Sequence, residues 1–126
     1  MDTLPRLLAG ALQQRLAAMP AVVLTGARQT GKSTLVRALA GDRRYRSLDD
    51  LDVREAARRD PDQLLGGGAP VTLDEVQREP ELLHEIKRAI DRRRVRGRYL
   101  LTGSANLLLM RGVSESLAGR AAYLAL

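Results

Sequence analysis

The first residues whose types and spacing could do chemistry form a glycine-rich segment near the N-terminus. Residues 26–33, GARQTGKS, match the pattern Gly-x-x-x-x-Gly-Lys-Ser/Thr in full. Gly26 and Gly31 permit backbone conformations that aim successive N–H groups at one anion. The Lys32 side chain can neutralise the charge of the β- and γ-phosphates, and the Ser33 hydroxyl can bind Mg²⁺. The pattern predicts a phosphate-binding loop, whose nucleotide contacts are expected from Gly26, Ala27, Arg28, Gln29, Thr30, Gly31, Lys32, Ser33 and Thr34.

A pair of acidic residues, Asp74 and Glu75, follows the short apolar segment at residues 71–73. A phosphate loop needs a carboxylate at the end of another strand to hold Mg²⁺, and Asp74 is placed for this role. Glu75 is placed to orient the attacking water and to accept its proton as general base. An acidic pair at a strand end is common, so the prediction depends on the loop upstream. The alternative for Glu75 is an exposed acid at the start of a helix.

The elements that must position these residues alternate along the chain. Apolar residues recur at helical spacing over residues 3–18. Strands are expected at 21–25, 45–48, 71–73, 99–102 and 121–126, and helical stretches at 33–40, 51–59, 81–94, 106–110 and 114–118. Asp50 is expected to cap the helix over 51–59, and the glycine run at 66–68 to be a plain connector rather than a lid. Such alternation predicts an α/β fold, a parallel sheet with helices on both faces.

Composition excludes several other classes of site. The chain of 126 residues has no Cys and one His, His84, which excludes disulfides, thiolate zinc sites, cysteine nucleophiles and multi-histidine metal sites. The absence of Phe and Trp argues against surfaces on which nucleic-acid bases stack. No apolar run approaches the roughly 20 residues that span a bilayer, and the N-terminus lacks the pattern of a secretory signal. We therefore expect a cytoplasmic protein with no membrane partner.

The formal net charge is +6, and arginine supplies almost all of the basic residues. Such an excess favours a polyanionic partner, or it reflects GC-rich bacterial coding. The densest cluster is Arg92, Arg93 and Arg94, followed by Arg96 and Arg98. The cluster could bind the phosphate backbone of a nucleic acid. Cations at a helix C-terminus also complement the helix dipole, and that interpretation is favoured here.

Four segments, taken in order, resemble one family. They are residues 26–35 (GARQTGKSTL), 73–77 (LDEVQ) with Pro80, 101–104 (LTGS) and 115–120 (ESLAGR). Together they are similar to the prokaryotic AAA-superfamily predicted ATPases, whose members carry a further C-terminal domain of unknown function. The resemblance covers essentially the whole chain. It implies ATP and Mg²⁺ as ligands, a P-loop core over residues 21–126 with a five-stranded sheet of order 5-1-4-3-2, and a preceding N-terminal helix within residues 1–20.

The resemblance also implies roles for polar residues after the fourth strand. The family's sensor position, which touches the γ-phosphate or the attacking water, matches Ser104 first, Thr102 second and Asn106 third. The alternative for Ser104 is the N-cap of the helix that follows. Arg120 matches the family's terminal arginine, which would meet a phosphate within one chain or across a subunit boundary. A structural ion pair is the alternative for Arg120.

Three functions stay open at this point. The first is binding of ATP·Mg²⁺ with hydrolysis through Glu75. The second is a nucleotide-binding switch or interaction module with little turnover, in a homo-oligomer or with a protein partner. The third is a P-loop phosphotransferase that acts on a small molecule. Because the sequence stops where members of the family continue, we expect a core without its helical lid and C-terminal domain, and weak turnover.

Overall fold

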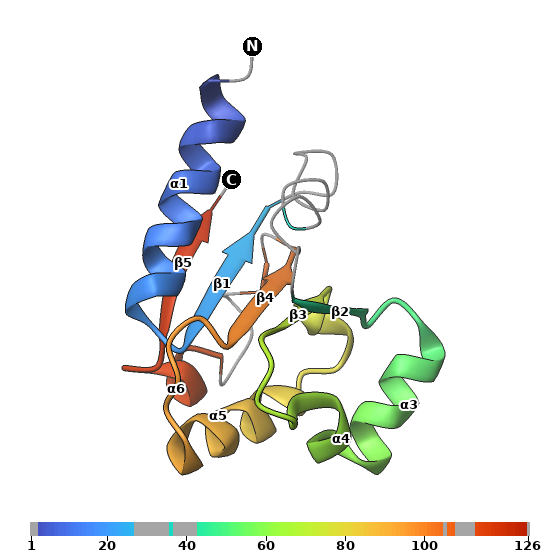
Figure 1. The fold of residues 1–126 in the computed structure, drawn as a ribbon. Helices are drawn as coiled ribbons and strands as arrows, with labels where there is room; N and C mark the ends of the chain where they lie inside the picture. Colours follow the sequence, from blue (N-terminus) through green and yellow to red (C-terminus); the bar gives the residue numbers. More distant parts are fainter. Residues whose placement is uncertain (1–2, 27–35, 37–42, 105, 108–112, 126) are drawn as a thin grey trace.

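The computed structural model describes residues 3–26, 36, 43–104, 106, 107 and 113–125. Five parallel strands form one sheet in the order β2-β3-β4-β1-β5 (Figure 1). The strands are β1 (Ala21–Thr25), β2 (Arg44–Ser47), β3 (Val71–Asp74), β4 (Tyr99–Gly103) and β5 (Ala121–Ala125). Read from the other side, this is the expected order 5-1-4-3-2, so the predicted α/β fold is confirmed.

Helices connect and flank these strands. They are α1 (Thr3–Ala18), α3 (Leu51–Arg59), α4 (Pro61–Leu65), α5 (Leu82–Arg92), α6 (Val113–Leu117) and the 3₁₀ turn η2 (Val76–Arg78). As expected, Asp50 caps α3, and its side chain accepts a hydrogen bond from the N–H of Asp52 at 2.8 Å. No helix in the described ranges is long and apolar enough to cross a membrane.

Two helix predictions need correction. Helix α5 is shorter than the expected range 81–94 because the backbone turns to an extended conformation at Arg93. Helix α4 was not expected at all, although Asp60 as a side-chain cap and Pro61 in its first turn are ordinary start signals. The helix expected over 33–40 and most of that over 106–110 lie outside the described residues.

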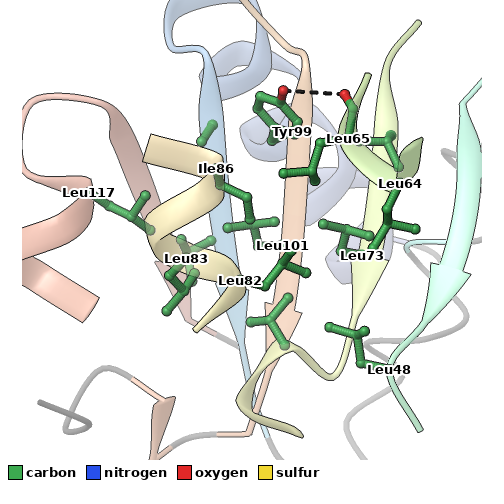
Figure 2. Packing of buried hydrophobic residues seen from close by; sticks show 14 of the residues in the cluster. Leu48, Leu64, Leu65, Leu73, Leu82, Leu83, Ile86, Tyr99, Leu101 and Leu117 are labelled. Atoms are coloured by element: carbon green, nitrogen blue, oxygen red, sulfur yellow. Dashed lines mark hydrogen bonds between the residues drawn. The ribbon is translucent and has the colours of Figure 1, made fainter. Parts of the chain in front are cut away.

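One face of the sheet packs against α4, α5 and α6. Leu83 and Ile86 of α5 and Leu117 of α6 pack with the cluster that holds Leu73 and Leu101 of the central strands (Figure 2). All these side chains are almost fully buried, and each contributes about 1.5–3 kcal/mol relative to an exposed position. This apolar stripe of α5, at helical spacing, fixes the helix on the sheet.

The opposite face packs against α1. Leu12 of α1 is completely buried and belongs to a second cluster with Val22, Leu24 and Leu100. Because successive strand residues face opposite sides, these positions alternate with those of the first cluster. The strands β1, β3 and β4 are therefore buried on both faces, as expected for the centre of a parallel sheet.

All carboxyl ends of the parallel strands meet at one edge of the sheet, the carboxyl edge, and all amino ends at the other, the amino edge. At the carboxyl edge, the N–H of Leu48 donates to the carbonyl of Asp74 at 2.9 Å. At the amino edge, the N–H of Val71 donates to the carbonyl of Arg98 at 2.8 Å. Ligands of open α/β sheets bind at the carboxyl edge, so the expected site belongs there.

Arg43, just before β2, fastens the amino edge. Its guanidinium donates to Thr72 Oγ1 at 3.0 Å and to the carbonyls of Gly97, Val71 and Arg98 at 2.7, 3.0 and 3.1 Å. Burial lowers the pKa of Arg43 to about 10, so the group is still charged at neutral pH. One side chain thus ties together the starts of β3 and β4.

Candidate functional site at the carboxyl edge

The predicted phosphate loop begins where β1 ends. Thr25 closes the strand, and the N–H of Gly26 donates to the carbonyl of Gly103 at 3.3 Å. This bond holds the first residue of the loop beside the end of β4. Residues 27–35 lie outside the described residues, so the roles of Lys32, Ser33 and their loop neighbours stay predictions.

Asp74, at the end of β3, is held by two hydroxyl groups. The Thr102 hydroxyl of β4 donates to one carboxylate oxygen, and the Tyr45 hydroxyl of β2 donates to the other at 2.5 Å. Asp74 is only 4% exposed, and no cationic side chain of the described residues lies within ion-pair distance of it. A buried carboxylate with neutral donors and no cation partner is suited to bind a divalent cation.

The strand register explains why these three residues meet. Tyr45 pairs with Thr72 and Ser47 with Asp74 in the ladder between β2 and β3. Residues two apart on a strand share a face, so Tyr45, Thr72 and Asp74 all face the α1 side of the sheet. The ladder between β3 and β4, in which Leu73 pairs with Leu101, brings Thr102 next to Asp74. Polar side chains thus replace the apolar ones where this face reaches the carboxyl edge.

Glu75 has an unusual backbone conformation. Its φ and ψ are 59° and 49°, and it is the one non-glycine residue with positive φ in the part of the chain that the structure describes. A left-handed conformation costs a non-glycine residue about 1–2 kcal/mol, and such strain is concentrated at functional sites. The N–H of Glu75 donates to Thr102 Oγ1 at 3.1 Å, so Thr102 contacts both acids of the pair.

Gln77 joins Glu75 to the end of β4. Its amide nitrogen donates to Glu75 Oε2 at 2.6 Å, and its amide oxygen accepts from the N–H of Ser104 at 3.4 Å. Gly103 makes room for this bridge, because a Cβ there would lie 3.0 Å from Gln77 Oε1 and 2.5 Å from Leu107 Cδ2. The structure therefore connects Asp74, Glu75, Thr102 and Ser104 through side-chain and backbone hydrogen bonds.

The candidate sensor residues have different surroundings. Thr102 is completely buried and donates a hydrogen bond to Asp74. Ser104 is half-buried beside Gln77, and Asn106 is exposed. Thr102, ranked second from the sequence, is the one that contacts the acidic pair directly. The proposed contact of Ser104 with nucleotide or water stays a prediction.

Arg120 lies away from this site. Its carbonyl accepts from the N–H of Ala21 at the amino edge, and its guanidinium forms a two-pronged pair with Asp91 at 2.7 and 3.0 Å. The hydrogen bond from Arg120 lowers the pKa of Asp91. Arg120 lies where β5 begins, at the edge opposite to Asp74, and its contact with a phosphate, within one chain or across a subunit boundary, stays a prediction. In this structure it forms the structural ion pair that was its alternative role.

Sequence reasoning missed Tyr45 and the bridging role of Gln77. The sequence held no signal for the Tyr45 contact, because it depends on the register that pairs Ser47 with Asp74. Gln77 stood inside the LDEVQ segment but had no chemical role assigned to it. His84, for which no function was expected, lies 3.4 Å from Ser116 Oγ through Nδ1, and the described residues hold no cluster of metal-binding side chains.

Known proteins share both the sequence and the fold. The uncharacterized proteins Rv2008c of Mycobacterium tuberculosis and Mb2031c of Mycobacterium bovis are each 39% identical to this chain over 114 residues. These residues are 89% of the chain, which spans 26% of the length of each relative.

Among solved structures, that of a DNA replication initiation factor superposes with a TM-score of 0.63 at 15% identity, covering 99% of this chain and 46% of the other. The structure of PCH-2 from C. elegans gives a TM-score of 0.50 at 16% identity, covering 98% and 42%. These two likenesses show a shared fold. The model of the AAA domain family matches residues 18–126, which include the phosphate-loop pattern and all five strands. The chain therefore belongs to the AAA domain family, whose members are nucleotide-binding P-loop domains.

Proposed function

We propose that the carboxyl edge binds ATP with Mg²⁺ and hydrolyses the bond to the γ-phosphate. One observation carries the proposal: the buried Asp74 carboxylate is held by two hydroxyls, has no cation partner among the described residues, and stands directly before Glu75. The start of the phosphate-loop pattern at Gly26 bonds to Gly103 at the end of β4, the strand that also carries Thr102, and this shared edge supports the same assignment. The strained backbone of Glu75 adds a second sign of a site built for chemistry.

Each residue has a distinct part in this proposal. Lys32 and the backbone N–H groups of the loop would bind the phosphates, while Ser33 and Asp74 would hold the metal. Mg²⁺, when bound, neutralises charge on the phosphate oxygens. Thr102 and Tyr45 keep the Asp74 carboxylate in one orientation, so that it need not reorganise when ligands bind.

Glu75 would act as the general base. Its carboxylate accepts a proton from the attacking water as the oxygen of that water approaches the γ-phosphorus. Gln77 holds Oε2 through a 2.6 Å hydrogen bond and so fixes the direction in which the carboxylate points. The same amide touches the backbone of Ser104, which links the base to the expected sensor position.

The test compares Glu75→Gln with Glu81→Gln, a control at an exposed glutamate close by in the chain. Affinity is measured with a fluorescent ATP analogue, and hydrolysis as single-turnover release of phosphate. We expect Glu75→Gln to bind the analogue as the parent does and to release phosphate about 10²–10⁴-fold more slowly, since the amide cannot accept a proton. The control should match the parent in both.

Two other results would change the proposed function or the residue assigned as its base. If the parent binds ATP but releases no phosphate, the chain is a nucleotide-binding switch. If Glu75→Gln hydrolyses ATP at the parental rate, another group is the base.

A further inference from the structure

The topology gathers arginines at the amino edge of the sheet, opposite the proposed ATP site. They come from three separate parts of the sequence, each just before a strand: β2, β4 or β5. We call this set the arginine edge: Arg43, Arg44, Arg92, Arg93, Arg94, Arg96, Arg98 and Arg120. Their common location follows from the backbone bonds that join the strand starts.

Carboxylates neutralise only two of these arginines among the described residues. Arg92 pairs with Asp62 at 3.4 Å, and Arg120 pairs with Asp91. The other six have no carboxylate of the described residues within ion-pair distance. The surplus of six charges at this edge equals the formal net charge of the whole chain, +6.

Four of the six unpaired arginines bond to neutral oxygens. The first is Arg43, whose bonds are described above. Arg44 donates to the carbonyls of Leu64 and Gly66, Arg98 to that of Leu65, and Arg94 to that of Gly119. A carbonyl satisfies an N–H group but leaves the positive charge in place. These arginines are therefore fixed in position and still electrostatically uncompensated.

Four members of the set are exposed: Arg92, Arg93, Arg94 and Arg96. Of these, Arg93 and Arg96 are the two whose guanidinium groups make no hydrogen bond or ion pair with any residue that the structure describes. The dipole of α5 supplies about half a negative charge at its C-terminus, which cannot balance Arg92, Arg93 and Arg94 together. The dipole interpretation favoured from the sequence thus accounts for part of the cluster only.

A hollow of about 240 Å³ lies within this surface. Arg92, Arg93 and Arg98 line it, together with Leu65, Gly66, Ala89 and Asp62, whose carboxylate pairs with Arg92. Planar guanidinium groups match phosphate oxygens in a two-pronged geometry, and Arg93 and Arg98 have no carboxylate partner among the described residues. The arrangement suits a phosphate group that presents several oxygens at once.

The surroundings of the arginine edge identify the class of partner. The large exposed apolar side chains of the described residues, Leu7, Leu51 and Tyr123, lie on α1, at the start of α3 and within β5, away from the arginine edge. Membrane surfaces and protein interfaces both need apolar anchors of this kind. The ring of Tyr99 is buried beneath Arg98, 5.3 Å from its guanidinium carbon, so no ring is offered for unpaired bases to stack on.

We propose that the arginine edge binds the phosphate backbone of double-stranded nucleic acid without reading its sequence. Repeated phosphates would meet the exposed Arg93, Arg94 and Arg96, in the positive field of the more buried guanidinium groups that carbonyls hold in place, and no base contact is required. The proposed ATP site lies at the opposite edge, so both ligands can bind at once. This inference does not depend on hydrolysis.

The test uses a fluorescein-labelled DNA duplex and fluorescence anisotropy over a range of salt concentrations. The variant Arg93→Glu/Arg96→Glu is compared with the charge-matched control Arg46→Glu/Arg78→Glu. Arg46 is exposed on β2, and Arg78 follows β3 at the carboxyl edge. We expect the parent and the control to bind with a steep salt dependence. The arginine-edge variant should lose at least about tenfold in affinity, and its slope of log affinity against log salt should fall by about two.

Circular dichroism melts check that each variant is folded. The affinity of Arg93→Gln/Arg96→Gln for the duplex should lie between those of the parent and the reversed-charge variant. Equal losses in both glutamate doubles would overturn the proposal, because binding would then follow net charge rather than place. Absence of parental binding at low salt would overturn it as well. Binding to vesicles of phosphatidylserine and phosphatidylcholine in preference to the duplex would assign the surface to membranes instead.

Discussion

The carboxyl and amino edges of the sheet are built from the same strands but carry side chains of opposite charge. At the carboxyl edge, the buried Asp74 faces neutral hydroxyls, and Glu75 adopts a strained backbone beside it. At the amino edge, Arg43 and its neighbours donate to main-chain carbonyls that precede or begin strands. Within the described ranges, the carboxyl edge holds a buried carboxylate bonded to neutral groups, and the amino edge holds guanidinium groups bonded to neutral groups.

The difference separates the proposed ATP site at the carboxyl edge from the proposed nucleic-acid surface at the amino edge. In the proposed function, Asp74 would hold a divalent cation, so the carboxyl edge would be organised around a ligand. Arg43 is satisfied by the backbone, so at the amino edge positive charge also stabilises the fold. Changes at the first edge should therefore alter binding and turnover, and changes at the second should alter stability.

The largest expected effect belongs to Lys32→Ala at the carboxyl edge. In the proposed function, Lys32 binds the β- and γ-phosphates, and removing its charge would forfeit a Coulomb attraction of about 4 kcal/mol. Titration with a fluorescent ATP analogue should show affinity reduced by at least about a hundredfold, with an unchanged melting curve. Lys87→Ala, at the other lysine of the chain, is the control. Equal affinity in both variants would refute the loop assignment.

Arg43→Met should show the converse at the amino edge. The substitution keeps the apolar stem but removes the guanidinium donor to Thr72 Oγ1 and to three carbonyls, of which that of Arg98 keeps the N–H of Val71. We expect urea unfolding to report a loss of about 2–3 kcal/mol, with ATP affinity unaffected. Arg46→Met is the matched control, since Arg46 is exposed on β2, the strand that follows Arg43, and bonds only to the carbonyl of Tyr45 among the described residues. A control as unstable as Arg43→Met would contradict the account.

Gln77→Met is expected to have a smaller effect, on turnover alone. Methionine has a similar length but cannot donate to Glu75 or accept from the N–H of Ser104. Single-turnover phosphate release should slow about tenfold because the base is less well oriented, while ATP affinity stays within about twofold. Gln63→Met, on the exposed side of α4, should match the parent. If affinity falls and the rate does not, Gln77 acts on binding rather than on Glu75.

The sequence predicted the fold because its signals are local. Apolar segments bounded by Gly and Pro placed β1, β3 and β4 to within a residue or two, and the Asp50 cap was readable from its type and position. The acids Asp74 and Glu75 were found because strand ends carry function in such sheets. Residues with long-range roles were not found. Tyr45 reaches Asp74 across 29 positions and Arg43 reaches Gly97 across 54, and such contacts depend on strand order and register. Helix α4 was missed although its start signals are local, because five residues are too few to show helical spacing.

The central claim about the carboxyl edge is that Asp74 couples the binding of Mg²⁺ to the binding of nucleotide. The direct measurement is the dissociation constant for ATP in Mg²⁺ and in EDTA, for the parent, Asp74→Asn and the exposed control Asp52→Asn. Mg²⁺ should tighten binding in the parent and in the control, and that gain should shrink at least about tenfold in Asp74→Asn, whose amide is a poorer ligand for a hard cation. The same gain in all three proteins would show that Asp74 does not hold the metal, and would contradict the assignment of the carboxyl edge.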